Sequence, residues 1–215
     1  MTENIEYEYR FYNIDENKVK KKIINLGGSK IHDKMLMRIN VYYHPQNKFN
    51  YYIRIRNEQS NGKKYYTLTV KKNIKPFPIE HETIINDPDE TDKILLMLGC
   101  KKKYTLEKIR ETWCLDDCKE IVFDSYLGLP TFVEIDCKSL ETLNKITKKL
   151  GFDRNKSEKE GTRSLYFNLY GIPKKSNWGD IIEFKNSYEI FDKLITKNKD
   201  KFKNIFDKQI AYLNK

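Results

Sequence analysis

Metal-binding cysteine motifs and long apolar runs are both missing from this chain of 215 residues. Its four cysteines, Cys100, Cys114, Cys118 and Cys137, form no Cys-x-x-Cys pair, and its three histidines are scattered, so no zinc-site spacing occurs. We therefore expect reduced thiols in a reducing compartment. No apolar run approaches the roughly 20 residues of a membrane span, and the N-terminus lacks the pattern of a signal peptide. These absences predict a soluble, cytoplasmic protein that does not bind a membrane.

Arginine is also scarce, although the chain is basic. Lysine and arginine together number 41 against 31 acidic residues, which gives a net charge of +10, and only seven of the basic residues are arginines. Such a charge is compatible with nucleic acid, with an acidic small molecule or with no specific partner. The richness in lysine, asparagine and isoleucine favours coding bias and solvated surfaces over a nucleic-acid footprint.

Eight segments have the composition of β-strands, because they are rich in Tyr, Ile, Val, Thr and Phe and are separated by turn residues. They span residues 5–12, 37–44, 50–57, 64–72, 79–86, 103–113, 119–126 and 130–138. Two connections, Gln46-Asn47 and Ser60-Asn61-Gly62, are short and polar. Short connections suit antiparallel hairpins, whereas parallel pairing needs a longer crossover. The sequence therefore predicts an antiparallel sheet made of consecutive hairpins.

Helical periodicity interrupts the strands at three places. The apolar positions are Val19, Ile23 and Leu26, then Ile94, Leu95 and Leu98, and finally Leu140, Leu143, Ile146 and Leu150, the last group between an expected N-cap at Ser139 and Gly151. Each helix is one-sided and should pack on the sheet. Helical periodicity returns in a lysine-rich background after Pro173. We therefore predict a main domain at residues 1–171 and a helical C-terminal appendage at residues 172–215.

Charged side chains alternate along several predicted strands. Glu6, Glu8 and Arg10 share one face of the first strand, while Tyr7, Tyr9 and Phe11 share the other, because strand side chains alternate with period 2. The same pattern recurs at Arg54 and Arg56, at Thr67, Thr69 and Lys71, at Glu80 and Glu82, at Lys108 and Arg110, and at Glu134 and Asp136, with Asp124 nearby. Four of the seven arginines lie on these faces. Arginine binds phosphate oxygens in a bidentate manner that lysine cannot reproduce, so the pattern favours phosphate binding.

An α+β fold accommodates these faces. We predict a closed eight-stranded antiparallel β-barrel with its charged faces inward and its helices packed outside. Eight strands leave an interior wide enough for side chains or one small ligand. A dry lumen containing so many charges would be unstable, because unpaired buried charge costs several kcal/mol. The lumen is therefore expected to hold water, an anionic ligand and Mg²⁺ or Mn²⁺, which bind protein carboxylates together with phosphates.

In order along the chain, these motifs resemble those of the CYTH family, also called the triphosphate tunnel metalloenzymes. The family's opening Glu-x-Glu-x-Lys is represented by Glu6-Tyr7-Glu8-Tyr9-Arg10. The resemblance covers about residues 5 to 170 and continues through the arginine pair, Lys71, the glutamate pair at 80 and 82, residues 106–110, residues 121–124 and residues 132–136. It implies a triphosphate tunnel that hydrolyses inorganic, nucleoside or thiamine triphosphate or RNA 5′-triphosphate ends.

The resemblance also implies roles for individual residues. One metal would lie at Glu6, Glu8, Glu134 and Asp136, and a second near Glu80, Glu82 or Asp124, where it could activate the attacking water. Phosphate oxygens would be bound by Arg10, Arg54, Arg56, Lys71, Lys108 and Arg110. The residues that we expect to matter most for catalysis are Glu6, Glu8, Arg10, Lys71 and Arg110. Catalysis would rest on positioning and charge stabilisation.

Two other functions remain open at this point. A class IV adenylyl cyclase would make cyclic AMP and pyrophosphate from ATP in the same tunnel, because a fold alone does not choose the reaction. A basic module that binds polyphosphate or an RNA 5′ end would need no catalysis. Tyrosine pairs such as Tyr42-Tyr43 and Tyr51-Tyr52 could stack bases, but we expect them to pack in the sheet. The oligomeric state is open, with a homodimer among the alternatives.

Overall fold

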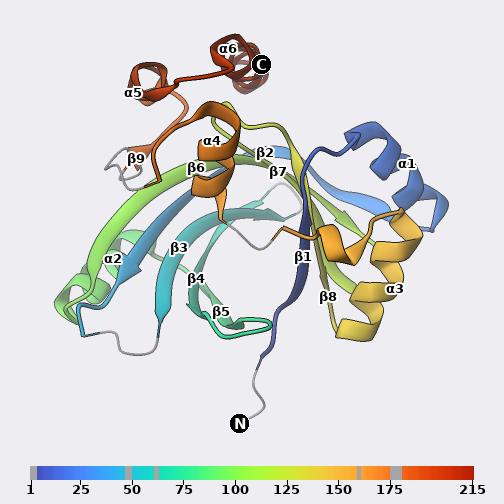
Figure 1. The fold of residues 1–215 in the computed structure, drawn as a ribbon. Coiled ribbons are helices and arrows are strands. Elements are labelled where there is room, and N and C mark those ends of the chain that lie inside the picture. Colours follow the sequence, from blue (N-terminus) through green and yellow to red (C-terminus); the bar gives the residue numbers. More distant parts are fainter. Residues whose placement is uncertain (1–3, 47–49, 61–62, 159–160, 175–180) are drawn as a thin grey trace.

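A computed structural model describes residues 4–46, 50–60, 63–158, 161–174 and 181–215. It is an α+β structure in which a long sheet curls around a central space (Figure 1). The strands of this sheet are β1 (Tyr7–Phe11), β2 (Ser29–Tyr43), β3 (Tyr51–Ser60), β4 (Lys63–Lys72), β5 (Ile79–Ile85), β6 (Lys101–Cys114), β7 (Cys118–Tyr126) and β8 (Phe132–Cys137). All eight predicted strands are thus confirmed, although β2 begins at Ser29, eight residues earlier than expected.

The strand order is β1-β8-β7-β6-β2-β3-β4-β5, and every neighbouring pair is antiparallel. The prediction of consecutive hairpins holds within β2 to β5 and within β6 to β8. It is wrong elsewhere, because β1 pairs with β8 and β2 pairs with β6. These two long-range pairings join the hairpin series into one curled sheet.

The prediction of a closed barrel is wrong. Within the described residues, the edge strands β1 and β5 meet through an isolated bridge between Ile5 and Ile79. Two backbone hydrogen bonds accompany it, from Glu6 N to the Pro78 carbonyl and from Glu80 N to the Asn4 carbonyl, both 3.0 Å long. Pro78 has no N–H group and cannot donate to a ladder. The sheet is therefore a curled half-barrel whose two edges touch at one end.

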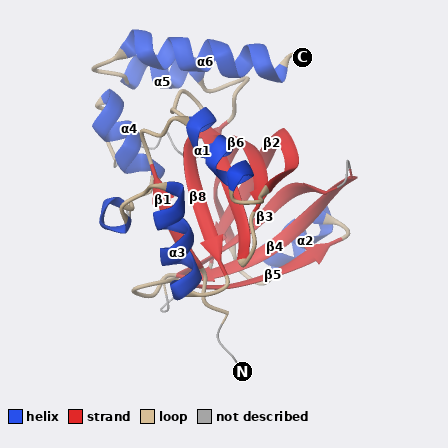
Figure 2. Cartoon of the chain, turned by 90° about the vertical axis from the view of Figure 1, so that its right-hand side faces the viewer, coloured by secondary structure: helices blue, strands red, loops and turns tan. Residues whose placement is uncertain are grey.

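Three helices lie at the predicted places on the convex side of the sheet, and their ends match local sequence signals. They are α1 (Glu16–Asn25), α2 (Pro88–Met97) and α3 (Leu140–Leu150). Ser139 caps α3 by accepting a 3.2 Å hydrogen bond from Thr142 N, and Gly151 ends it at φ 84°. Glycine adopts this left-handed conformation without the Cβ penalty of other residues. Figure 2 shows α1 and α3 against one side of the sheet.

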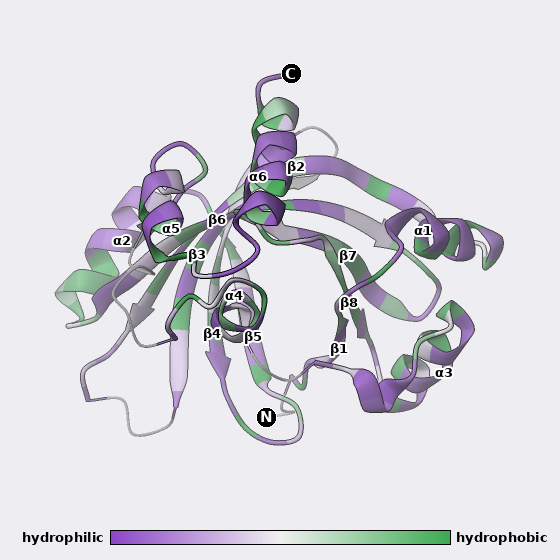
Figure 3. Ribbon diagram, turned by 45° about the horizontal axis from the view of Figure 1, so that its top comes forward, coloured by the Kyte–Doolittle hydropathy of each residue, from purple (hydrophilic) through white to green (hydrophobic). Residues whose placement is uncertain are grey.

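The hydrophobic core lies between these helices and the outward-facing strand residues. The largest cluster joins Val19 and Ile23 of α1 and Leu143 of α3 to the sheet at Ile121 and Ile135. A second cluster places Leu95 of α2 against β2 and β3. Hydrophilic and hydrophobic residues alternate along the strands (Figure 3). The alternation therefore separates an apolar convex face from a charged concave face.

The C-terminal segment packs on the top of the sheet through elements that include a helix missed by the sequence analysis. That helix is α4 (Thr162–Tyr170), and η1 (Arg154–Lys156) precedes it. The segment continues through β9 (Ile181–Ile182), which runs parallel to β6, and then α5 (Tyr188–Leu194) and α6 (Lys199–Leu213). Phe184, Phe191 and Phe202 share a buried cluster with Leu127 and Tyr166. The division between residues 171 and 172 stays a prediction.

One cysteine pair differs from the expectation of four reduced thiols. Cys118 and Cys137 form a disulfide, whereas Cys100 and Cys114 are free. The pair lies directly opposite across β7 and β8, with a Cα–Cα distance of 3.7 Å. This juxtaposition follows from strand register, which no local cysteine spacing reveals. Within the described ranges, no helix is long and apolar enough to cross a membrane.

Candidate functional site

The concave face of the sheet contains a cavity of about 450 Å³ lined mainly by charged side chains. It includes all six cations predicted to bind phosphate, namely Arg10, Arg54, Arg56, Lys71, Lys108 and Arg110. It also includes six of the seven predicted metal ligands, namely Glu6, Glu8, Glu80, Glu82, Glu134 and Asp136. The structure thus brings together side chains from six strands and from the residue before β1. They lie up to about 130 positions apart in the sequence.

The arginine pair of β3 is held by acids on β5 and by one hydroxyl on β4. Arg54 Nη2 donates to Glu80 Oε1 at 3.1 Å, and Arg56 Nη2 donates to Glu82 Oε2 at 3.0 Å. Arg56 Nε also donates to Thr67 Oγ1 at 3.4 Å. Arg54 lies opposite Thr69 in the register of β3 and β4, and Thr69 lies opposite Glu82 in that of β4 and β5. The guanidinium groups are therefore fixed on one wall of the cavity.

Asp124 is the one predicted metal ligand that does not line this cavity, and it is fully buried behind two of the cations. Its carboxylate accepts from Lys108 Nζ at 2.6 Å, from Arg110 Nε at 2.8 Å and from Arg110 Nη2 at 2.7 Å. Burial alone would raise the pKa of Asp124, but Arg110 and Lys108 hold it well below its ordinary value. Asp124 therefore positions the cations of β6.

Lys108 is buried and has an unusual acidity for a lysine. Burial, followed by the neighbouring charge of Arg110, lowers the pKa of Lys108 to about 8, against the opposing effect of Asp124. Desolvation disfavours the ammonium form, and a nearby like charge does the same. An anion placed in the cavity would favour the charged form of this side chain.

The acids of β1 and β8 meet across the strand register. Arg10 lies opposite Glu134, and Glu8 lies opposite Asp136. Arg10 forms ion pairs with Glu134 and, at 3.4 Å, with Glu8. Burial and the neighbouring Glu134 raise the pKa of Glu8 to about 8, although Arg10 acts in the opposite direction. The carboxylates repel one another here, which a bound cation would relieve.

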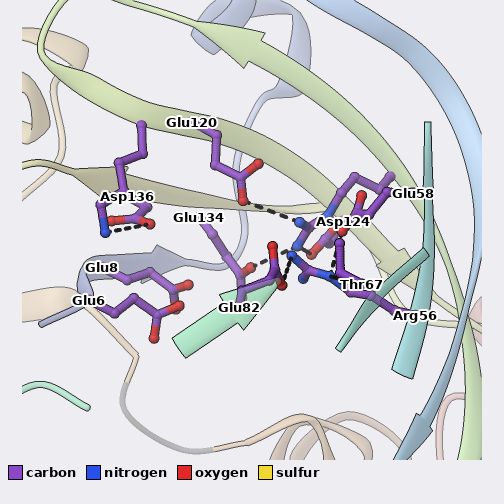
Figure 4. A network of polar contacts seen from close by, with 12 residues as sticks. Glu6, Glu8, Arg56, Glu58, Thr67, Glu82, Glu120, Asp124, Glu134 and Asp136 are labelled. Carbon is purple, nitrogen blue, oxygen red and sulfur yellow. Dashed lines mark hydrogen bonds and ion pairs between the residues drawn. The ribbon is translucent and has the colours of Figure 1, made fainter. Parts of the chain in front are cut away.

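Two further acids, Glu6 and Asp136, lie beside Glu8 and Glu134. Glu6 pairs with Lys71, whose ammonium also lies 3.6 Å from Glu80 Oε2. Asp136 lies 3.8 Å from Lys119, but burial raises the pKa of Asp136 to about 7 despite that cation. Among the described residues, Asp136 Oδ1 is a buried oxygen without a hydrogen-bond donor. Figure 4 shows Glu6, Glu8, Glu134 and Asp136 near one another.

These donors fit a divalent metal ion in their chemistry. Carboxylate oxygens are the ligands that Mg²⁺ and Mn²⁺ prefer, and the donor-free oxygen of Asp136 is available to a cation. Across the part of the chain that the structure describes, no three histidine, cysteine or acidic side chains are already gathered as a metal-binding group. Most of the acids are instead paired with arginines and lysines, so metal binding would require them to exchange partners.

Several cavity residues escaped the sequence analysis. Glu58 pairs with Arg56 at 2.5 Å, and Glu120 accepts from Arg110 Nη1 at 3.3 Å. Glu58 continues the two-residue period of Arg54 and Arg56, so extending that pattern would have found it. Glu120 shares a face with Asp124, but apolar Val122 stands between them and interrupts the charged pattern. The tyrosines at positions 52, 65 and 126 also line the cavity.

The curled antiparallel sheet, with cations and carboxylates on its concave face, has the architecture expected of the CYTH family. The CYTH domain model matches residues 4–163, and the chain belongs to this family. None of the curated proteins compared with the chain matches it significantly in sequence.

Several solved structures share the fold of this chain. A protein from Pyrococcus horikoshii, PH1819, is 24% identical, with a TM-score of 0.60 over 76% of this chain and 98% of that one. A protein from Vibrio parahaemolyticus proposed to be an adenylate cyclase is 14% identical, with a TM-score of 0.65 over 76% and 98% of the two chains. A proposed adenylyl cyclase from Hippeastrum, described as having a dominant triphosphatase activity, is 13% identical, with a TM-score of 0.50 over 80% and 99%. At these identities the likeness shows the shared fold.

Proposed function

We propose that this protein is a metal-dependent enzyme that hydrolyses the terminal phosphate of a triphosphate chain held on the concave face of the sheet. The observation that carries the proposal is the gathering of seven cationic side chains and eight acidic ones around one cavity of about 450 Å³. Cations alone would suit an anion-binding module. The acids beside them suit an enzyme that also holds a metal ion.

The cations would bind the phosphate oxygens and neutralise their charge. Arg54 and Arg56 present planar groups that match phosphate geometry, and Lys108 and Arg110 are buried at 4% and 5% exposure, where charge interactions are strong. Asp124 holds both cations of β6 in place before substrate arrives. Such preorganised charge stabilises a phosphoryl-transfer transition state without reorganisation during the reaction.

The acids of β1 and β8, Glu6, Glu8, Glu134 and Asp136, would hold the metal ion. When bound, Mg²⁺ or Mn²⁺ supplies positive charge to phosphate oxygens and lowers the pKa of coordinated water. The arginines and lysines that now pair with these acids would turn to the phosphates. In the overall reaction, a water oxygen bonds to the terminal phosphorus and the bridging P–O bond breaks, releasing orthophosphate. The triphosphatase activity described for the Hippeastrum protein supports the proposal.

Phosphate release from tripolyphosphate, with Mg²⁺, with Mn²⁺ and with EDTA, tests the proposal. We expect orthophosphate with either metal and none with EDTA. The double substitution Glu6→Gln with Glu8→Gln should abolish release and weaken Mn²⁺ binding measured by electron paramagnetic resonance. Glu90→Gln, on the exposed surface of α2, is the matched control. Release that survives both the double substitution and EDTA would contradict a metal-dependent reaction at this site.

The products made from ATP distinguish the other two functions. Cyclic AMP and pyrophosphate without orthophosphate would identify an adenylyl cyclase, the activity proposed for the Vibrio parahaemolyticus protein. Binding of polyphosphate or RNA that falls steeply with salt, without any turnover, would identify a binding module.

A further inference from the structure

A second cavity, of about 550 Å³, lies at the end of β2, β3 and β6. Aromatic rings and lysines dominate its lining, whereas alternating acids and arginines line the first cavity. We call it the tyrosine basin and define it by Val41, Tyr43, Tyr52, Lys102, Lys103 and Tyr104. We call the first cavity, on the concave face of the sheet, the charged cavity. The tyrosine basin differs from it in composition, which indicates that it binds a different chemical group of the ligand.

The tyrosine basin continues the charged cavity along the same face of the sheet. Val41 lies opposite Arg54 on β3 and opposite Tyr104 on β6. Tyr52 is two residues from Arg54, so it faces the same side about 7 Å farther along the strand. Tyr104 lies four residues before Lys108 on β6, and this even spacing places both side chains on the concave face. Tyr52 lines both cavities and therefore marks their junction.

The floor of this region is apolar. Met37, Ile39 and Val41 of β2 are buried, and the half-buried rings of Tyr52 and Tyr104 pack against them. Tyr43, at the rim, is 37% exposed. The rings of Tyr52 and Tyr104 thus pack on the apolar floor and keep part of their surface accessible to a ligand. Tyrosines held in this way can stack on a planar ligand at little cost in side-chain entropy.

An irregularity in the sheet brings two lysines to the rim. Val41 pairs with Tyr104, but the next residue of β2, Tyr42, pairs with Lys102. Lys103 is therefore an extra residue in β6, as in a β-bulge, and such bulges re-aim neighbouring side chains. Both Lys102 and Lys103 line the tyrosine basin as a result. Lys103 supplies positive charge and hydrogen-bond donors beside the aromatic rings, whereas the Lys102 ammonium lies 3.9 Å from Asp92 of α2.

We propose that the tyrosine basin binds the nucleobase of a nucleoside triphosphate while its triphosphate lies in the charged cavity. This inference rests on the proposed function and narrows its substrate class. A nucleobase has a flat face for stacking and acceptor atoms for lysine, and every base offers both. A thiamine triphosphate would place a cationic ring beside Lys103, which like-charge repulsion disfavours. Inorganic triphosphate would leave the basin unused.

The experiment compares two ligands that differ only by the nucleoside. Binding of β,γ-methylene-ATP is measured by isothermal titration calorimetry with Mg²⁺, and kcat/KM for orthophosphate release is measured with ATP and with tripolyphosphate. Tyr43→Ala and Tyr104→Ala should each weaken binding of the analogue and lower kcat/KM for ATP by about five- to 100-fold, the range expected for base stacking. Release from tripolyphosphate should change less than about twofold. Tyr104→Phe should restore ATP use, because it keeps the ring.

Tyr66→Ala is the matched control. Tyr66 lies in β4 next to Thr67, whose hydroxyl faces the cavity, so its own ring is on the opposite face. Equal losses for ATP and tripolyphosphate, or no loss for either, would overturn the inference. A wild-type protein that releases no orthophosphate from either substrate would contradict the proposed function instead. In that case the effect of Tyr43→Ala on analogue binding still decides whether the basin binds the base.

Discussion

The charged site is built from pairs of side chains that face each other across strands. Arg10 and Glu134, Lys71 and Glu80, and Arg110 and Asp124 are direct register partners. The period-2 pattern predicted which residues share the concave face, because alternation is a local property of a strand. It could not predict these partners, since register depends on long-range pairing. For this reason Asp124 was predicted as a metal ligand, whereas the structure shows it bonded to two buried cations.

Asp124→Asn should destabilise the protein at pH 7 by about 3–5 kcal/mol, because it leaves Lys108 and Arg110 buried without their counter-charge. The folded-state pKa of Asp124 lies below its unfolded value, so its contribution is complete above about pH 4 and is lost as the pH falls further. Urea unfolding measures the free energy of unfolding of the wild-type and Asp124→Asn proteins at pH 7 and at pH 3. The difference between the two proteins should be smaller at pH 3. A difference that grows on acidification would refute this account. Asp33→Asn, 82% exposed, should be nearly neutral.

Arg56→Lys tests whether the shape of the guanidinium matters as well as its charge. The Arg56 fork reaches Thr67, Glu82 and the cavity, and lysine keeps the charge but loses the fork. We expect the affinity for tripolyphosphate, measured by calorimetry, to fall about tenfold or more. Arg154→Lys, on the exposed η1 turn, should leave the affinity unchanged. Equal affinities for wild-type and Arg56→Lys protein would mean that charge alone binds the phosphates.

At the scale of elements, strands and capped helices were predictable and the C-terminal packing was not. The strands have strong alternation, and Ser139 and Gly151 mark the ends of α3. The start of β2 was missed because register shifts near His32 disturb its alternation. Helix α6 is held by contacts that sequence does not show. Gln209 accepts from Gly128 N at 2.8 Å and donates to the Tyr126 carbonyl at 2.9 Å.

Phe202→Ala tests the attachment of α6. The Phe202 side chain is 1% exposed and occupies the space beside Gly128, where an added Cβ would lie 2.1 Å from the ring. Its truncation should lower the free energy of unfolding by about 3–5 kcal/mol. Lys203→Ala, at the neighbouring exposed position, should change it by less than about 0.5 kcal/mol. Chemical denaturation of the two variants makes the comparison, and similar small effects would mean that α6 contributes little to the fold.

At the scale of the whole molecule, the sequence pattern predicted a charged interior correctly. It also predicted a closed barrel, whereas the structure is a curled half-barrel. Closure depends on how β1 and β5 meet, and within the described residues they join through one bridge beside Pro78. A half-barrel still places cations and acids around one space, and its open edge gives that space access to solvent. The ion pairs that fill it compensate the charges before a ligand binds. The function that we propose would therefore depend on exchanging internal ion pairs for bonds to phosphate and metal.

Hydrolysis of ATP in ¹⁸O-labelled water, followed by ³¹P nuclear magnetic resonance, tests the central claim most directly. If water attacks the terminal phosphorus in the charged cavity, wild-type protein with Mg²⁺ or Mn²⁺ will produce ADP and orthophosphate, with the label in the orthophosphate alone. The Glu6→Gln, Glu8→Gln protein will produce neither. Cyclic AMP and unlabelled pyrophosphate, or label in ADP, would contradict the claim.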